Sequence, residues 1–125
     1  MSQDNGGANE RTGVAGESML TKKYYIVQLD ASGNIEVGEG ATDLIVGVLQ
    51  NKPDTGEAAV VRFNGTTKVI FGGNVAIGDW LTSDSSGKAI ATTTDGNITI
   101  GRALVAGVDG DIGEVQMSIQ HLYIA

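Results

Sequence analysis

The stretch from Asp43 to Phe71 constrains the fold most, because it carries the most regular strand and turn signals in the chain. Its sequence, DLIVGVLQNKPDTGEAAVVRFNGTTKVIF, alternates apolar, β-branched runs with turn residues, which is typical of antiparallel strands. Asn64-Gly65 is the strongest of its turn signals, since both residues readily take the positive φ of a tight hairpin. The sequence therefore predicts a β-meander in which Ala58–Phe63 pairs with Thr67–Phe71.

Several of these signals recur 54 residues further along the chain. The matches at that spacing are Val46-Gly47 with Ile100-Gly101, Asp30 with Asp84, Ser32 with Ser86 and Gly33 with Gly87. An internal duplication explains this repetition, but so does the general enrichment of Gly, Asp and Ser in turns. The sequence leaves both explanations open.

Strand signals continue on both sides of this stretch. Tyr24–Leu29 is rich in β-branched and aromatic residues, and Glu114–Ile119 alternates apolar with polar side chains, which indicates a half-buried strand. Asp95-Gly96 is a further hairpin signal. Thr99–Val105 is the best candidate for a helix, but its glycine and β-branched residues disfavour one. We predict an all-β fold, a single compact β-barrel or β-tulip-like domain of short strands over residues 23–125.

Residues 1–22 differ from the rest of the chain in composition. Residues 1–18 are rich in Gly, Asn, Ser and Glu and show no periodic apolar positions, so they cannot bury a core of their own. We expect an extended N-terminal arm that is ordered only by contacts from outside the domain, most simply with a neighbouring subunit. The predicted contact residues are apolar and basic residues of the arm and of its junction with the domain, and the single tryptophan: Arg11, Val14, Met19, Leu20, Lys22, Lys23 and Trp80.

Two of these assignments have plain alternatives. Trp80 follows Gly78-Asp79 at the start of a strand, where it could belong to the core instead of an interface. Lys22-Lys23 could contact an acidic partner, but paired lysines at a surface linker are commonly just solvated.

Charge and composition exclude several classes of function. The 15 acidic and 8 basic side chains give a net charge of −7, which opposes binding to the phosphate backbone of a nucleic acid. The chain has no cysteine, so disulfides and thiolate metal sites are excluded. No apolar run approaches the length of a membrane span, and the first residues lack the pattern of a secretion signal. We expect neither a membrane partner nor export by that route.

No set of residues in the sequence suggests catalysis. His121 is the only histidine, and no serine or acid around it suggests a catalytic triad. Asp109, Asp111 and Glu114 lie close together but lack the spacing and the further oxygen ligands of an EF-hand loop. The glycines form no phosphate-binding motif. We predict a protein without enzymatic activity, cofactor or metal.

Five segments together resemble the bacteriophage capsid cement, or head decoration, proteins: IVGVLQ, GEAAVVRFNGTTKV, NVAIGDWLTSDSSGKAI, ITIGRALVAG and GEVQMSI. The similarity runs from about Tyr25 to Ile119. The resemblance implies a structural virion protein, assembled in the host cytoplasm, that binds the outer surface of an icosahedral phage head. It implies two partners, the major capsid protein, whose subunit contacts it would stabilise, and other copies of itself in a homotrimer.

Two other classes of function remain as alternatives. A small carbohydrate-binding or other surface-binding β module would fit the strand content, but the chain has few aromatic residues for stacking on sugars and no secretion signal. A hydrolase subunit fits least, because no nucleophile is paired with a base.

Overall fold

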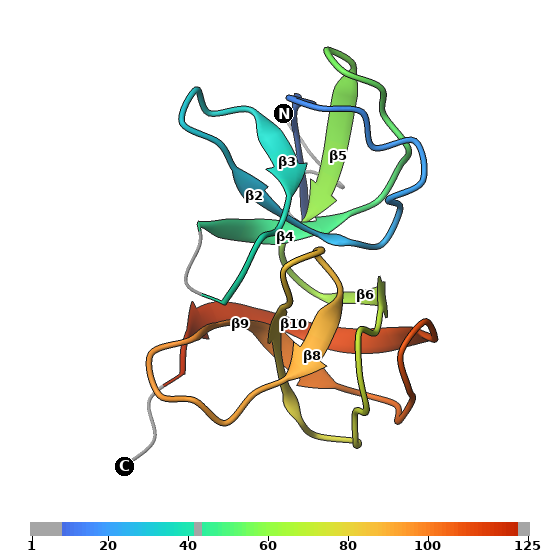
Figure 1. Cartoon of the computed structure of the whole chain (residues 1–125), viewed down its shortest axis with the longest axis vertical. Helices are drawn as coiled ribbons and strands as arrows, with labels where there is room; N and C mark the ends of the chain where they lie inside the picture. Colours follow the sequence, from blue (N-terminus) through green and yellow to red (C-terminus); the bar gives the residue numbers. More distant parts are fainter. Residues whose placement is uncertain (1–8, 42–43, 123–125) are drawn as a thin grey trace.

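The computed structural model describes residues 9–41 and 44–122, which form ten β-strands in two sheets. The upper sheet in Figure 1 consists, in spatial order, of β1 (Glu10–Val14), β5 (Ala58–Arg62), β4 (Ile45–Leu49), β2 (Ile26–Leu29) and β3 (Ile35–Val37). The lower sheet consists of β6 (Thr66–Ile70), β10 (Ile112–His121), β9 (Ile98–Ala103), β7 (Trp80–Ser83) and β8 (Ala89–Ala91).

All of these strand pairs are antiparallel, and the described residues include no helix. It follows that this part of the chain contains no helix that could cross a membrane. The predicted all-β fold is confirmed, and β9 occupies the segment in which a short helix was considered.

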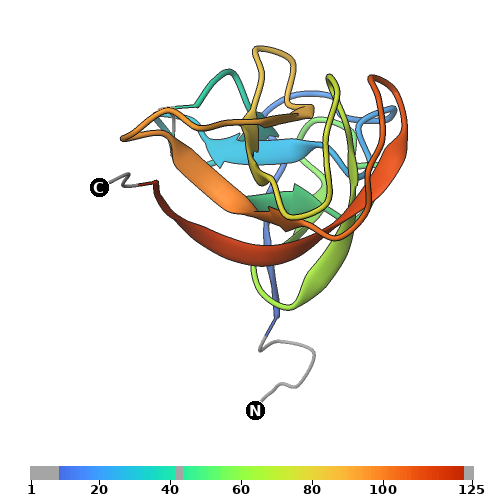
Figure 2. The same cartoon turned by 90° about the horizontal axis from the view of Figure 1, so that it is seen from below.

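Each sheet curls until its two outermost strands approach one another. Ala15, just after β1, forms an isolated parallel bridge with Ile35 in β3, and Phe71, just after β6, forms one with Ala89 in β8. Figure 2 shows the same curvature in β10, which bends beside β9. A single bridge is not a continuous ladder, so the sheets are not closed into barrels. The compact β domain is confirmed, whereas the more specific β-barrel is not.

The two sheets are copies of one five-strand unit. Adding five to each strand number of the upper sheet gives the order of the lower sheet. The registers agree as well: Ile26 pairs with Val48, and Trp80 pairs with Arg102, each residue 54 positions later. The general enrichment of Gly, Asp and Ser in turns would not reproduce the strand order and the register. The structure therefore supports an internal duplication. We call β1–β5 with their loops the first repeat and β6–β10 with their loops the second repeat.

The repeated turn residues have the same role in both repeats. Asp30 Oδ1 accepts hydrogen bonds from the backbone N–H groups two and four residues later, at 2.8 and 2.9 Å. Asp84 Oδ1 does the same at the same two distances. Gly33 and Gly87 complete the turns with φ of 82° and 81°, a conformation that favours glycine. Each turn therefore joins the second and third strands of its repeat in the same hairpin.

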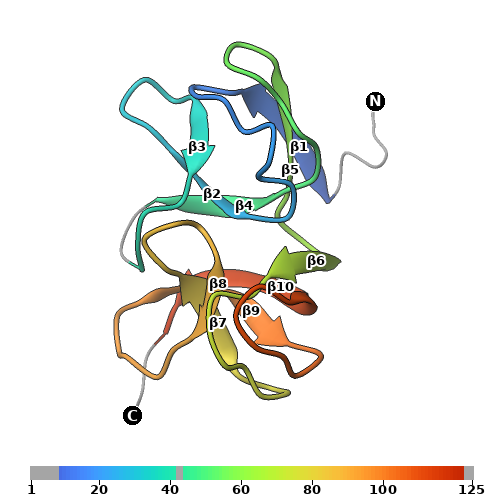
Figure 3. The same ribbon diagram turned by 45° about the vertical axis from the view of Figure 1, so that its right-hand side comes forward.

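Each repeat has its own hydrophobic core. The core of the first repeat comprises Ala15, Met19, Val27, Ile35, Leu49, Ala59 and Val61. That of the second repeat is built around Phe71, Leu81 and Val115 and extends into the first repeat through Ile26, Ile45 and Val48. These last side chains come from β2 and β4, the strands that lie toward the second repeat in Figure 3. The shared apolar contacts hold the two repeats together.

The two Asx-Gly hairpin predictions are wrong in their pairing. Asn64-Gly65 does turn the chain, with φ of 78° at Gly65, but β5 and β6 belong to different sheets. This turn carries the chain from the first repeat to the second. Asp95-Gly96 likewise does not pair its flanking strands, because β7 lies between β8 and β9. Turn residues set local backbone angles, whereas core packing selects which strands pair.

The expectation that only outside contacts order the N-terminal segment is wrong for its described part. β1 pairs with β5 along its whole length, from Glu10↔Arg62 to Val14↔Ala58. Beyond β1, the backbone N–H of Met19 donates to Pro53 O at 2.8 Å, and the Met19 side chain is completely buried. The predicted arm of residues 1–22 thus contains a strand of the first repeat, equivalent to β6 in the second. Residues 1–8 lie outside the described residues.

Candidate interaction surfaces

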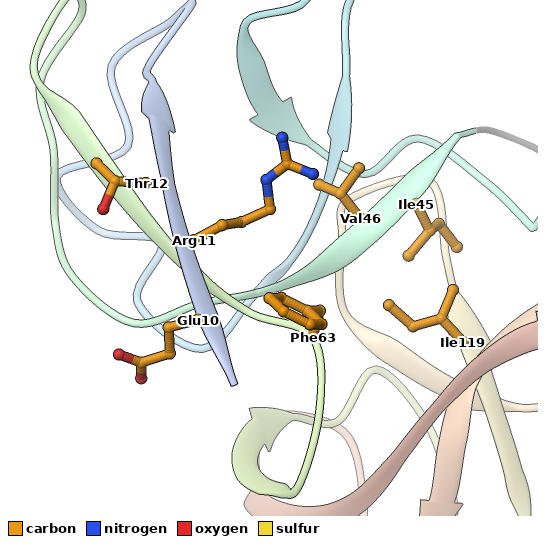
Figure 4. Close-up of a pocket in the computed structure, with 7 residues that line it drawn as sticks. All are labelled: Glu10, Arg11, Thr12, Ile45, Val46, Phe63 and Ile119. Carbon is orange, nitrogen blue, oxygen red and sulfur yellow. The ribbon is translucent and has the colours of Figure 1, made fainter. Parts of the chain in front are cut away.

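A groove with a volume of about 590 Å³ lies between the two repeats. Its lining comes from β1, β4, the turn after β5, and β10: Glu10, Arg11, Thr12, Ile45, Val46, Phe63 and Ile119. Figure 4 shows four apolar side chains, from Ile45, Val46, Phe63 and Ile119, facing this space from both repeats. A groove that combines apolar and polar side chains in this way suits a protruding side chain or segment of a partner.

Strand alternation places two opposite charges on the two faces of β1. The Glu10 carboxylate accepts hydrogen bonds from Arg62, at 2.6 Å from Nη2 and 3.1 Å from Nε. Arg62 Nη1 also donates to Thr66 O at 2.9 Å and so spans the connection between the repeats. The next residue, Arg11, points the other way, with its guanidinium directed toward Val46 across the groove (Figure 4).

Arg11 makes no ion pair among the described residues. Its exposed guanidinium therefore places a positive charge beside an apolar surface, in a protein whose net charge is −7. Arginine is well suited to this position, because it is weakly hydrated and binds carboxylates with two parallel hydrogen bonds. The groove can accept an apolar group flanked by an acidic one.

The other predicted contact residues of the N-terminal segment divide between core and surface. Met19 is completely buried in the core of the first repeat, so the prediction that it anchors a partner is wrong for this structure. Val14 and Leu20 are about half exposed and remain available. The Nζ atoms of Lys22 and Lys23 lie 4.8 and 5.0 Å from the ring centroids of the next two tyrosines, Tyr25 and Tyr24 respectively. Both lysines thus make cation–π contacts within the chain.

Trp80 occupies the position in the second repeat that Ile26 has in the first. Its side chain is half-buried, and the guanidinium carbon of Arg102 lies 4.9 Å from the ring centroid. Arg102 Nε in turn donates to Gly78 O at 3.1 Å, which fixes the guanidinium over the ring. Trp80 is therefore neither fully in the core nor an open aromatic surface.

The predicted contact residues do not form one site. Arg11 lines the groove between the repeats, whereas Lys22 lines a polar depression beside Glu17 and Glu39, and Trp80 lies in the second repeat. The sequence reasoning missed the apolar lining of the groove, because its residues are far apart in the chain. It also missed a group of exposed aliphatic residues in the second repeat: Ile77, Leu104, Val105, Val108 and Ile112.

The acidic residues considered for a calcium loop serve the local structure. The Asp111 carboxylate accepts a hydrogen bond from the Val108 N–H at 3.0 Å, and Asp109 lies 3.5 Å from Lys88 Nζ in an ion pair. Across residues 9–41 and 44–122, no group of three or more His, Cys, Asp or Glu side chains could hold a metal ion. These carboxylates therefore stabilise a turn and a surface contact.

Comparison with known proteins gives a family and a fold. A family model described as phage cement protein matches residues 21–119, which span both repeats except β1 and the C-terminal end of β10. Among solved structures, the chain is similar to the head fiber gp8.5 N base in bacteriophage phi29, with a TM-score of 0.69 and 20% sequence identity. The match covers 92% of this chain and 98% of that chain. No curated protein matches the sequence.

Proposed function

Since the chain belongs to the phage cement protein family, we propose that it binds the outer surface of an icosahedral phage head and stabilises contacts between major capsid protein subunits. The family itself makes it a structural protein of the phage particle without an enzymatic role. The observation that carries the proposal is the extent of the match, since residues 21–119 include the core of the second repeat and all of the first repeat's core except Ala15 and Met19.

One feature of the surface supports a role in binding another protein. The groove between the repeats joins an apolar lining to the positive charge of Arg11, and such a mixture of apolar core and polar rim is typical of interfaces. We further propose that Val14, Leu20, Lys22, Lys23 and Trp80 take part in contacts with the capsid or with other copies of the chain. Those copies would form a homotrimer, as the family resemblance implies.

A carbohydrate-binding module fits the structure less well. Binding a sugar by stacking needs an open aromatic face. The one tryptophan, Trp80, has the Arg102 guanidinium over its ring at 4.9 Å. A sugar would have to displace this contact.

Cosedimentation with shells that lack the protein tests the proposed function. We expect the pure protein to pellet with shells built from the major capsid protein and to raise their resistance to heat or denaturant. Light scattering of the free protein should give the mass of a trimer. Failure to bind shells, together with binding to a glycan array, would replace the proposal with the carbohydrate alternative.

A charge reversal tests the groove separately. Arg11→Glu should weaken binding to shells by about tenfold, because it loses a charge-assisted contact and places an acidic group beside the groove. Lys52→Glu makes the same charge change at an exposed loop position outside the groove lining and is the matched control. Equal binding by both variants would remove the groove from the interface but leave the proposed function in place.

A further inference from the structure

Five exposed aliphatic side chains belong to the second repeat. Their exposed fractions are 72% for Ile77, 42% for Leu104, 37% for Val105, 54% for Val108 and 62% for Ile112. We call this set the apolar end.

Backbone hydrogen bonds bring the segments of the apolar end together. The N–H of Val75 donates to Gly107 O at 2.9 Å, and the N–H of Gly107 donates back to Val75 O at 3.0 Å. Further along, the N–H of Gly78 donates to Ala103 O at 2.8 Å. The loop before β7 therefore runs antiparallel to the chain that leaves β9, which places Ile77 opposite the residues after β9. Both segments lie at one end of the second repeat in Figures 1 and 3.

The register of β10 adds its first residue to the same end. The N–H of Leu104 donates to Glu114 O at 2.9 Å, so Leu104 lies opposite Glu114. Ile112 is two residues from Glu114 on the same strand, and both are exposed, whereas Gly113 and Val115 between and beyond them are buried. Ile112 and Leu104 are thus diagonal neighbours on the outer face of the sheet.

The first repeat shows that the fold does not require these apolar residues. Its equivalents, 54 residues earlier, are Lys23, Gln50, Asn51, Asp54 and Ala58. Asn51 binds its own loop, donating from Nδ2 to Ala58 O at 2.9 Å and accepting from Val60 N–H at 3.0 Å. Four of the five equivalents are polar or charged and the fifth is an alanine, so at these positions one backbone design carries a mainly polar surface in the first repeat and a fully aliphatic one in the second. The fold therefore does not account for the exposed aliphatic residues of the apolar end, and another role must explain them.

The size of the apolar end is that of a functional surface patch. Its five residues expose roughly 400 to 500 Å². A standard interface between two proteins buries about 800 Å² on each partner, of which about 60% is apolar. The apolar end can therefore supply the apolar part of one such interface, and on a shell the several contacts of one assembly act together and multiply the affinity.

The charges at the apolar end argue against a self-associating pair. Residues 72–79 and 104–112 contain three aspartates, Asp79, Asp109 and Asp111, and no lysine or arginine. Lys88 pairs with Asp109 at 3.5 Å and Arg102 donates to Gly78 O, whereas Asp79 and Asp111 make no ion pair among the described residues. Two copies meeting through this end would bring like charges together, which disfavours association. A basic rim on the partner would instead complement it.

From these observations we propose that the apolar end docks on the major capsid protein of the shell, on an apolar surface rimmed by lysine or arginine. This inference rests on the proposed function and assigns the second repeat, not the first, to the shell. The groove beside Arg11 is then a second and separate contact surface.

Matched double variants of the full chain test the assignment. Ile77→Ser with Ile112→Thr removes the two most exposed aliphatic side chains and keeps a β-branched residue in β10. Asp54→Ser with Ala58→Thr changes two exposed equivalent positions of the first repeat and is the control. We expect the first variant to bind undecorated shells at least about tenfold more weakly and the control within about twofold of the unmodified chain. Both should keep their urea midpoints, because the altered side chains are on the surface.

Each other outcome overturns the assignment in a distinguishable way. Unchanged shell binding by the Ile77–Ile112 variant means that this end does not face the shell. A loss of oligomer mass in light scattering, with weaker shell binding only as its consequence, means that the end joins copies of the chain. If the unmodified chain itself does not bind shells, the proposed function fails first and this assignment fails with it.

Discussion

Gly47 and Gly101 occupy equivalent positions inside β4 and β9 and share an unusual backbone conformation, with φ of 151° and 146°. At each glycine a Cβ atom would collide with a carbonyl oxygen of the adjacent strand, Arg62 O at Gly47 and Gln116 O at Gly101. Neither glycine lies in a turn. Turn chemistry therefore does not explain their repetition, and the close approach of two strands does.

We expect Gly101→Ala to lower the free energy of unfolding by at least about 2 kcal/mol, because it combines backbone strain with a collision that involves backbone atoms. Gly110→Ala separates these effects, since Gly110 has a φ of 90° but no atom within 4 Å of an added Cβ. We expect Gly110→Ala to lower the free energy of unfolding by about 1 kcal/mol. Urea midpoints of the two variants measure the difference. Equal destabilisation would show that the collision relaxes and that conformation alone requires the glycine.

The sequence was sufficient for the positions of most strands but not for their partners. The alternation of apolar and polar residues correctly located β10, and Asp30 and Gly33 correctly marked the turn between β2 and β3. Asn64-Gly65 gave the right turn and the wrong pairing. A turn sequence specifies the φ and ψ of a few residues, whereas pairing depends on which sheet can bury the next strand.

The surfaces were harder to predict than the strands. Arg11 was identified from its charge, but the groove it lines also needs Ile45, Phe63 and Ile119, which only the packing of one repeat on the other brings together. Met19 and Leu20 form an isolated apolar pair among polar residues, so no periodic pattern marked Met19 as part of the core. The apolar end would have been visible from an alignment of the two repeats, because four of its five residues are equivalent to polar or charged residues of the first repeat.

The N-terminal segment should prove essential to the fold. Deleting residues 2–16 removes β1, exposes the edge of β5 and removes Ala15 from the core of the first repeat. We expect a loss of several kcal/mol in the free energy of unfolding and a lower urea midpoint. Deleting residues 2–8, which end before the first described strand, is the control. Equal midpoints for both deletions would show that β1 contributes little.

Met19 and Leu20 are adjacent residues for which the structure predicts opposite outcomes. Met19→Ala should destabilise the protein by about 2 to 5 kcal/mol, because the Met19 side chain is completely buried in the core of the first repeat. Leu20→Ala should change stability by no more than about 0.5 kcal/mol, because about half of the Leu20 residue is exposed. Thermal unfolding of both variants compares them directly. Similar losses would mean that the loop packs differently in solution.

Phe71 and Gly113 form a size-matched pair in the core of the second repeat. The Phe71 ring is completely buried, and a Cβ atom on Gly113 would collide with it. In the first repeat, the equivalent residues are Ala15 and Ala59, which are both small and both buried. The two repeats thus fill the same space in two ways, with one large ring beside a glycine or with two alanines.

This exchange predicts a non-additive pair of substitutions. Phe71→Ala alone should cost about 3 to 5 kcal/mol through the cavity it leaves, and Gly113→Ala alone about 1 to 3 kcal/mol through overpacking. In the Phe71→Ala background, the added methyl group of Gly113→Ala meets no ring, reproduces the alanine pair of the first repeat and fills part of the cavity. It should then be neutral or stabilising, which gives a coupling energy of about 1 to 3 kcal/mol in a double-mutant cycle measured by urea unfolding. Additive losses would show that the ring and the glycine are not matched and that the two cores solve their packing independently.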